Sequence, residues 1–188
     1  IYPPKDYKKW AEICEHIIMH YTEGWADGFK YNIEYWEIWN EPDLDADDAE
    51  NKRTWGGTKS QFFDLYEVAA KHLKSCFPEL KIGGPALAFN EEWVADFLAE
   101  MHKRNVPMDF FSWHCYCVEP DAILGRAERF RRMLDAHGYQ NTESILKNFE
   151  VCAVAIIADR EIIYNKINTR VDSMINDGLE NEVNMLKD

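Results

Sequence analysis

The chain has 188 residues, 46% of them hydrophobic and 14% aromatic, which is enough apolar material for the core of one or two domains. Its formal net charge of -13 argues against a nucleic acid partner and favours a neutral or cationic one. The longest apolar run, residues 151–158, is far too short to cross a bilayer, so we expect no membrane partner.

The cysteines and the histidine beside two of them predict neither disulfides nor a metal. Five cysteines are scattered through a chain too large to need disulfide staples, which predicts reduced thiols and a cytoplasmic location. Cys115 and Cys117 follow His114, but a C-x-C spacing without a second cluster is a poor zinc signature. The sequence therefore predicts no metal and no cofactor.

The first half of the chain predicts two helices around a strand. Apolar residues recur at helical spacing over residues 7–21. After a glycine-containing loop, residues 33–39 form an apolar run typical of a buried strand. The second helix opens at Thr58, where Thr-Lys-Ser-Gln has the form of a capping box, and Pro78 marks its exit.

The alternation continues in the second half. Residues 81–88 predict a short strand, and Asn90 is placed to cap the next helix. Residues 108–116 predict another strand and residues 123–137 another helix, with a further strand beginning near Thr142. Because no two strands are close enough for a hairpin, the order is typical of a parallel α/β sheet, either a barrel or an open doubly wound sheet.

Polar groups follow three successive strands, which favours the barrel. Asn40 and Glu41 follow the first, the glycine-rich "GGPA" belongs to the second, and His114 and Tyr116 end the third. Groups that converge from the carboxyl ends of neighbouring parallel strands form the active face of a (β/α)8 barrel.

Four segments carry a family resemblance: "WEIWNEPD", "TWGGTKSQFFDLYEVAAKHLK", "LKIGGPALA" and "VPMDFFSWHCY". In this order and spacing they resemble the clan A glycoside hydrolases, and most of all family 39, whose best-known members are β-xylosidases. The resemblance covers residues 2–146 and implies a partial (β/α)8 TIM barrel, with strands four to seven, over residues 1–146. A whole barrel needs about 250 residues, and the open sheet edges of a partial one favour self-association.

The resemblance also assigns the site. Glu41 follows an apolar strand, where partial desolvation favours its protonated form and suits a general acid. By resemblance, Glu41 is the acid/base of a retaining glycosidase acting on β-xylosides or related glycosides, and Asn40 donates to the sugar 2-hydroxyl. His114 and Tyr116 match the pair that lines the sugar site and touches the catalytic carboxylates.

Plainer alternatives stand beside these roles. Glu41 could be a solvated loop carboxylate, and His114 could be a core histidine. Trp55 and Trp113 could form walls of sugar subsites, or they could simply pack in the core.

The second carboxylate of a retaining mechanism is hard to place. It should lie about 5–5.5 Å from the first, and the family carries it at the end of strand seven. Here "HGYQNTESIL" is followed by "KNFE", which departs from the family pattern. Asn148 stands where the nucleophile is expected, and an amide cannot form the glycosyl ester. Glu150, about 6–7 Å further along the strand, is the remaining candidate, because Glu143 lies near the strand's start.

The tail has a different resemblance. "DREIIYNKINTRVDSMINDGLENEV", within residues 148–188, is similar to a segment of the bacterial tRNA dimethylallyltransferases in which a strand leads to a helix. The phosphate loop of that family, G-x-x-x-x-G-K-[ST], does not occur in the chain. Residues 147–188 are therefore expected to form a strand and helices without transferase activity. The alternatives to a working glycosidase are an inactive carbohydrate-binding or structural fragment and a chimeric chain.

Overall fold

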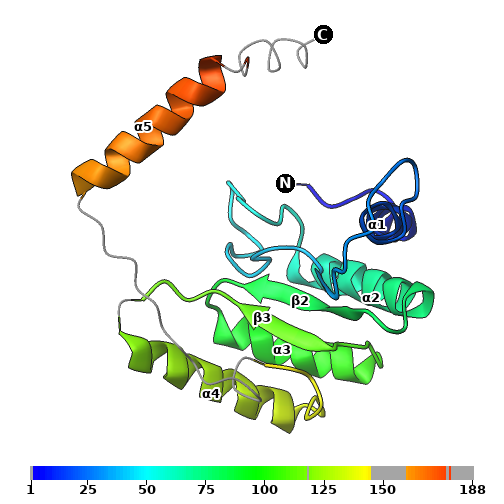
Figure 1. The fold of residues 1–188 in the computed structure, drawn as a ribbon. Helices are drawn as coiled ribbons and strands as arrows, with labels where there is room; N and C mark the ends of the chain where they lie inside the picture. Colours follow the sequence, from blue (N-terminus) through cyan, green and yellow to red (C-terminus); the bar gives the residue numbers. More distant parts are fainter. Residues whose placement is uncertain (1, 118, 145–159, 177, 179–188) are drawn as a thin grey trace. The chain divides into compact units, whose positions relative to one another are not determined.

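The computed structural model describes residues 2–117, 119–144, 160–176 and 178. The chain forms two compact units, Ile1–Glu150 and Val151–Asp188. In chain order the elements are α1 (Tyr7–Thr22), β1 (Tyr35–Glu37), α2 (Lys59–Cys76), β2 (Lys81–Leu87), α3 (Glu91–Lys103), β3 (Phe110–Trp113), α4 (Pro120–Ala136) and α5 (Arg160–Asn176) (Figure 1). None of the described helices is long and apolar enough to cross a membrane.

The strands of the first unit form one parallel sheet in the order β1-β2-β3, which confirms the predicted parallel α/β class. Trp36 of β1 pairs with Ile82 of β2, and Gly83 of β2 pairs with Phe110 of β3. A Cβ atom at Gly83 would lie 2.2 Å from the carbonyl oxygen of Phe110. Glycine at this position therefore lets β3 approach β2, which explains part of the "GGPA" segment.

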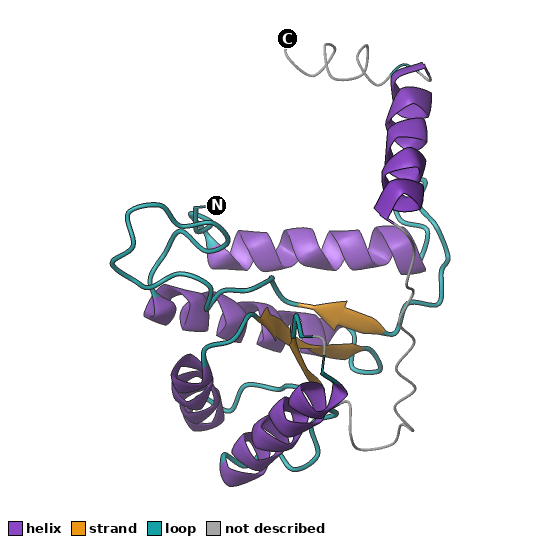
Figure 2. Ribbon diagram, turned by 90° about the vertical axis from the view of Figure 1, so that its left-hand side faces the viewer, coloured by secondary structure: helices purple, strands orange, loops and turns teal. Residues whose placement is uncertain are grey.

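Within the described residues, helices cover one face of the sheet and leave the other open. Figure 1 shows α3 and α4 below the strands, and Figure 2 shows α1 lying along α2, with which it packs. Side chains under the helices, such as Ile82 and Phe111, are buried, whereas Tyr35 on the opposite face is 50% exposed. The core between α2 and α3 is largely aromatic, with Tyr66 edge-on to Phe97 at a centroid distance of 4.9 Å.

The helix ends follow the sequence closely. The Thr58 side chain accepts a hydrogen bond from the backbone N–H of Gln61, whose side chain bonds back to the Thr58 N–H, so the predicted capping box is confirmed. The Asn90 side chain accepts from the Trp93 N–H and caps α3 as predicted. Such caps typically stabilise a helix by about 1 kcal/mol.

The predicted buried strand over residues 33–39 is wrong in extent and in burial. Only Tyr35–Glu37 forms a regular strand, and both Tyr35 and Glu37 are exposed. The reason is position, because β1 lies at one edge of the described sheet and its face away from the helices has no cover among the described residues. β3 is also shorter than predicted and ends at Trp113.

The predicted strand near Thr142 is represented by a single parallel bridge between Glu143 and Phe110. The rest of that strand, the predicted domain boundary after residue 146 and the strand expected at the start of the tail lie outside the described residues. In the second unit, α5 confirms the helix expected from the tail pattern, and Gly178 has a positive φ of 102° as expected for a residue that follows a helix.

Candidate active site

Glu41 stands in an irregular turn at the carboxyl end of β1. The backbone N–H of Glu41 donates to the carbonyl of Ala86 at 2.9 Å, and the hydroxyl of Thr54 donates to the Glu41 carbonyl at 2.5 Å. Glu41 has a φ of 50° and Trp39 a φ of 71°, both in the left-handed region. Non-glycine residues adopt this conformation at a cost of about 1–2 kcal/mol each, so the surrounding hydrogen bonds hold the turn against local strain.

The carboxylate of Glu41 meets the imidazole of His114. Glu41 Oε1 lies 2.7 Å from His114 Nδ1, and the two side chains are 16% and 33% exposed. His114 follows β3 directly, and its N–H donates to the carbonyl of Leu87 at the end of β2. Arg126 of α4 donates to the His114 carbonyl at 2.9 Å. The carboxyl ends of β1 and β3, on either side of β2, therefore bring together two residues that are 73 positions apart in sequence.

Asp43, two residues after Glu41, also anchors this turn. Asp43 is 3% exposed, and its carboxylate accepts hydrogen bonds from the backbone N–H groups of Ala88, Phe89 and Asn90 at 2.7, 2.9 and 2.8 Å. It thereby ties the segment after Glu41 to the link between β2 and α3. A buried carboxylate satisfied by backbone donors is a strong tether, because hydrogen bonds to charged groups contribute about 1.5–3 kcal/mol each.

The remaining predicted site residues divide into two groups. Asn40 is exposed, and Tyr116 is 95% exposed, with its ring centroid 6.4 Å from that of His114. Trp55 and Trp113 are 3% and 9% exposed. Their rings pack on core side chains, which agrees with the core-packing alternative rather than with walls of a sugar subsite.

Two carboxylates considered as nucleophiles are also accounted for. Glu143 accepts a hydrogen bond from Tyr35 and pairs with Lys81, so it lies at the amino ends of β1 and β2, opposite to the end that carries Glu41. These two partners lower the pKa of Glu143, Lys81 first, although partial burial opposes them. Glu150 lies outside the described residues.

Sequence reasoning missed Asp43 and Arg126. Asp43 was visible as the last residue of "YWEIWNEPD", but its partners are backbone groups 45–47 residues away, for which the sequence carries no signal. Arg126 is one of several arginines in α4, and nothing local in the sequence distinguishes it. Of the cysteines considered for zinc, Cys115 and Cys117 have thiols 3.3 Å apart, and Cys117 also contacts the Glu119 carbonyl.

Comparison of the chain with known proteins identifies its family. Residues 1–157 match the glycosyl hydrolases family 39. The chain belongs to this family. It is 39% identical over 121 residues to a β-xylosidase of Geobacillus stearothermophilus, a match that covers 61% of this chain and 21% of that enzyme. The crystal structure of a glucosidase from Croceicoccus marinus superposes with a TM-score of 0.66 at 33% identity, covering 76% of this chain and 30% of that one.

The matches cover only part of the related proteins. The chain spans about a fifth of the length of the β-xylosidases that it matches, 21% and 22% in two cases. A stretch of 48 residues is 46% identical to a tRNA dimethylallyltransferase of Flavobacterium psychrophilum, covering 26% of this chain and 16% of that enzyme. The family 39 region therefore carries the turn of Glu41 and His114, and part of the chain resembles a second family.

Proposed function

We propose that this chain carries the proton-donor side of a family 39 active site that acts on β-xylosides or related glycosides by a retaining mechanism. The observation that supports it most is the contact of 2.7 Å between Glu41 and His114 at the carboxyl ends of β1 and β3, the two parallel strands that flank β2. In this proposal Glu41 is the acid/base, and Asn40 and Tyr116 contact the sugar.

The proposed chemistry follows from the position of Glu41. A carboxyl group that is 16% exposed is partly shielded and still accessible to a ligand. It would donate a proton to the glycosidic oxygen as the bond to the anomeric carbon breaks, and then accept a proton from the water that releases the sugar. His114 would fix the carboxyl by its hydrogen bond, as a positioning residue.

The experiment below tests whether the chain also supplies the nucleophile of this mechanism. Double displacement requires a second carboxylate about 5–5.5 Å from Glu41. Glu150 is the proposed candidate. Because Asn148 stands at the expected position and an amide cannot act as the nucleophile, the alternative is a chain that binds the sugar without cleaving it.

The open sheet supports a further part of the proposal, namely that the first unit is a half-barrel corresponding to strands four to seven. A hollow of about 440 Å³ lies along β3 and is lined partly by Tyr35, Phe110 and Ser112, on the face that the described helices leave uncovered. A barrel would close over this face. Because the described residues leave this face open, we propose self-association through the sheet edges, and we propose that the transferase-like tail has no part in catalysis.

The test combines an aryl β-xyloside with sodium azide. If the nucleophile is present, the chain releases phenol unaided. If only the acid/base is present, azide attacks the anomeric carbon, the bond from that carbon to the aryl oxygen breaks, and Glu41 protonates the departing oxygen to give an α-xylosyl azide.

With phenyl β-xyloside as the substrate, either result supports the role of Glu41 when Glu41→Gln slows the reaction by about 10²–10⁴-fold. A chain that raises its melting temperature with xylose but shows no turnover in either arm is the carbohydrate-binding alternative. A chain that neither binds xylose nor reacts contradicts the proposal.

A further inference from the structure

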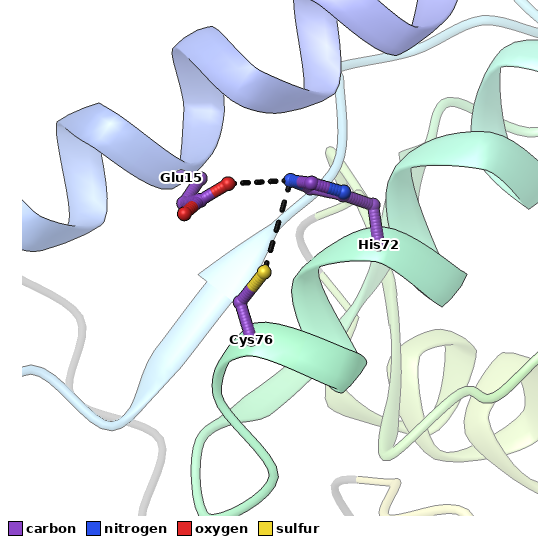
Figure 3. A group of neighbouring side chains, drawn as sticks. All are labelled: Glu15, His72 and Cys76. Atoms are coloured by element: carbon purple, nitrogen blue, oxygen red, sulfur yellow. Dashed lines mark hydrogen bonds and ion pairs between the residues drawn. The ribbon is translucent and has the colours of Figure 1, made fainter.

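A carboxylate, an imidazole and a thiol converge between α1 and α2, in a part of the first unit that the glycosidase proposal does not use. Glu15 projects from α1, and His72 and Cys76 project from the last turns of α2 (Figure 3). Cys76 ends the helix that leads into the start of β2, so the group lies toward the amino ends of the strands. Glu41 stands at the carboxyl ends.

The three donor atoms are close enough to share one ion. His72 Nε2 lies 2.6 Å from Glu15 Oε2 and 3.8 Å from Cys76 Sγ. All three donor atoms lie within 4.8 Å of one another. His72 and Cys76 are four residues apart on one helix, which places their side chains on the same face. The cluster therefore spans two helices and joins residues 57 positions apart in sequence.

Both short contacts end on the same imidazole nitrogen, as Figure 3 shows. In a neutral ring, Nε2 offers either a proton or a lone pair, and not both. If Nε2 donates to Glu15, it has no lone pair to accept a proton from the Cys76 thiol; if it accepts from the thiol, the carboxylate faces a lone pair. A cation at the centre of the group would receive electron pairs from the oxygen, the nitrogen and the sulfur together.

We propose that Glu15, His72 and Cys76 form a binding site for Zn²⁺ or a divalent ion of similar preference. Zinc takes carboxylate oxygen, imidazole nitrogen and thiolate sulfur as ligands, and its usual coordination number of four leaves one position for water. Magnesium and calcium are disfavoured, because they prefer oxygen ligands alone.

The surroundings of the cluster suit a cation. Among the described residues, the ion-pair partner of Glu15 is His72. The neighbouring lysines of α2 are engaged elsewhere, Lys71 with Glu67 and Lys74 with Asp109. The chain as a whole carries a net charge of -13, which raises the local concentration of cations.

A bound ion would clamp α1 to α2. The Glu15 and His72 side chains are 26% and 31% exposed, so an ion can enter without unfolding of the core. Because an ion that binds only the folded chain stabilises it by mass action, zinc is expected to raise the melting temperature in proportion to the logarithm of its concentration.

The test uses Co²⁺ as a spectroscopic probe and Zn²⁺ as its competitor, with the full chain stripped of metal by a chelator. Wild-type protein should develop a sulfur-to-cobalt charge-transfer band that saturates and that Zn²⁺ abolishes. His72→Asn and Cys76→Ser should weaken binding by at least about 100-fold, since even outer partners of metal sites cost about 10–100-fold when they are removed.

Cys117→Ser is the matched control, because Cys117 is also an exposed thiol but belongs to the C-x-C pair. It should leave the band and the zinc-dependent melting shift unchanged. A band that persists in Cys76→Ser, a band lost in Cys117→Ser, or the absence of any band in the wild type would each overturn the proposal. None of these readouts depends on sugar turnover, so the zinc site and the glycosidase proposal can fail separately.

Discussion

The first unit contains two carboxylate–histidine pairs of nearly equal length in very different settings. Glu41 and His114 are 2.7 Å apart and follow two strands of the sheet, whereas Glu15 and His72 are 2.6 Å apart and bridge two helices. The pair at the strand ends has strained backbone beneath it. The pair between the helices has a thiol beside it. We infer that the surroundings, and not the pair, separate a proton donor from a metal ligand.

The largest expected effect comes from removing the anchor of one pair only. Asp43→Ala leaves three backbone N–H groups without their buried acceptor, so we expect the free energy of unfolding to fall by roughly 3–5 kcal/mol. Urea unfolding of the wild type and the variant measures this. Glu15→Ala is the control for loss of a partly exposed carboxylate and should cost less than about 1 kcal/mol. Equal losses in the two variants would remove the distinction between the pairs.

Replacing the histidine of each pair by asparagine, in two separate variants, compares the pairs directly. His114→Asn frees the Glu41 carboxyl, and a misplaced catalytic group loses about 100-fold in rate, so kcat for an aryl β-xyloside with azide present should fall by that order while KM changes little. His72→Asn should leave kcat unchanged and weaken cobalt binding by at least about 100-fold. A His114→Asn variant with unchanged kcat, or a His72→Asn variant with reduced kcat, would show that the two pairs do not have separate roles.

A further variant tests the core of the first unit, which contains neither pair. The Tyr66 hydroxyl is buried in α2 and has no hydrogen-bond partner among the described residues. Tyr66→Phe removes the unsatisfied group and should stabilise the chain by about 1 kcal/mol, as measured by thermal or urea unfolding, without altering either pair. A clear loss of stability would reveal a partner for the hydroxyl and would require a different account of this core.

The smallest effect concerns Glu143, a carboxylate at the amino ends of the strands. Lys81 and Tyr35 lower its pKa from the ordinary value of 4.5, so its contribution to stability is present above that pH and is lost as the pH falls. Because the pair with Lys81 is largely exposed, Glu143→Gln should cost less than about 1 kcal/mol at neutral pH. Unfolding curves of the two proteins should converge below pH 4.5. A difference that persists in acid would exclude this charge effect.

The features that could be predicted from the sequence are those that depend on interactions between residues close together in the chain. The helices, the caps at Thr58 and Asn90 and the parallel order follow from periodicity and from side chains within a few residues, and all were predictable. Local spacing also suggested that residues from three strand ends would meet, and Glu41 and His114 do meet. The roles of these residues stay a proposal.

The parts that could not be predicted depend on distant groups. The exposure of β1 depends on which strands are present beside it, and a hydrophobic run alone does not report that. The left-handed turn at Trp39 and Glu41 is held by hydrogen bonds to Ala86 and Thr54, which are far along the chain. The Glu15 cluster was missed because its His-x-x-x-Cys half is a common helical spacing and its third ligand lies on another helix.

The most direct test of the central proposal is how the loss of rate in Glu41→Gln depends on the leaving group of the substrate. With azide supplied throughout, loss of a proton donor should slow cleavage of phenyl β-xyloside by about 10²–10⁴-fold and cleavage of the activated dinitrophenyl β-xyloside by less than about 10-fold. Glu15→Gln should affect neither substrate. If Glu41→Gln slows both substrates equally, or slows neither, Glu41 is not the proton donor.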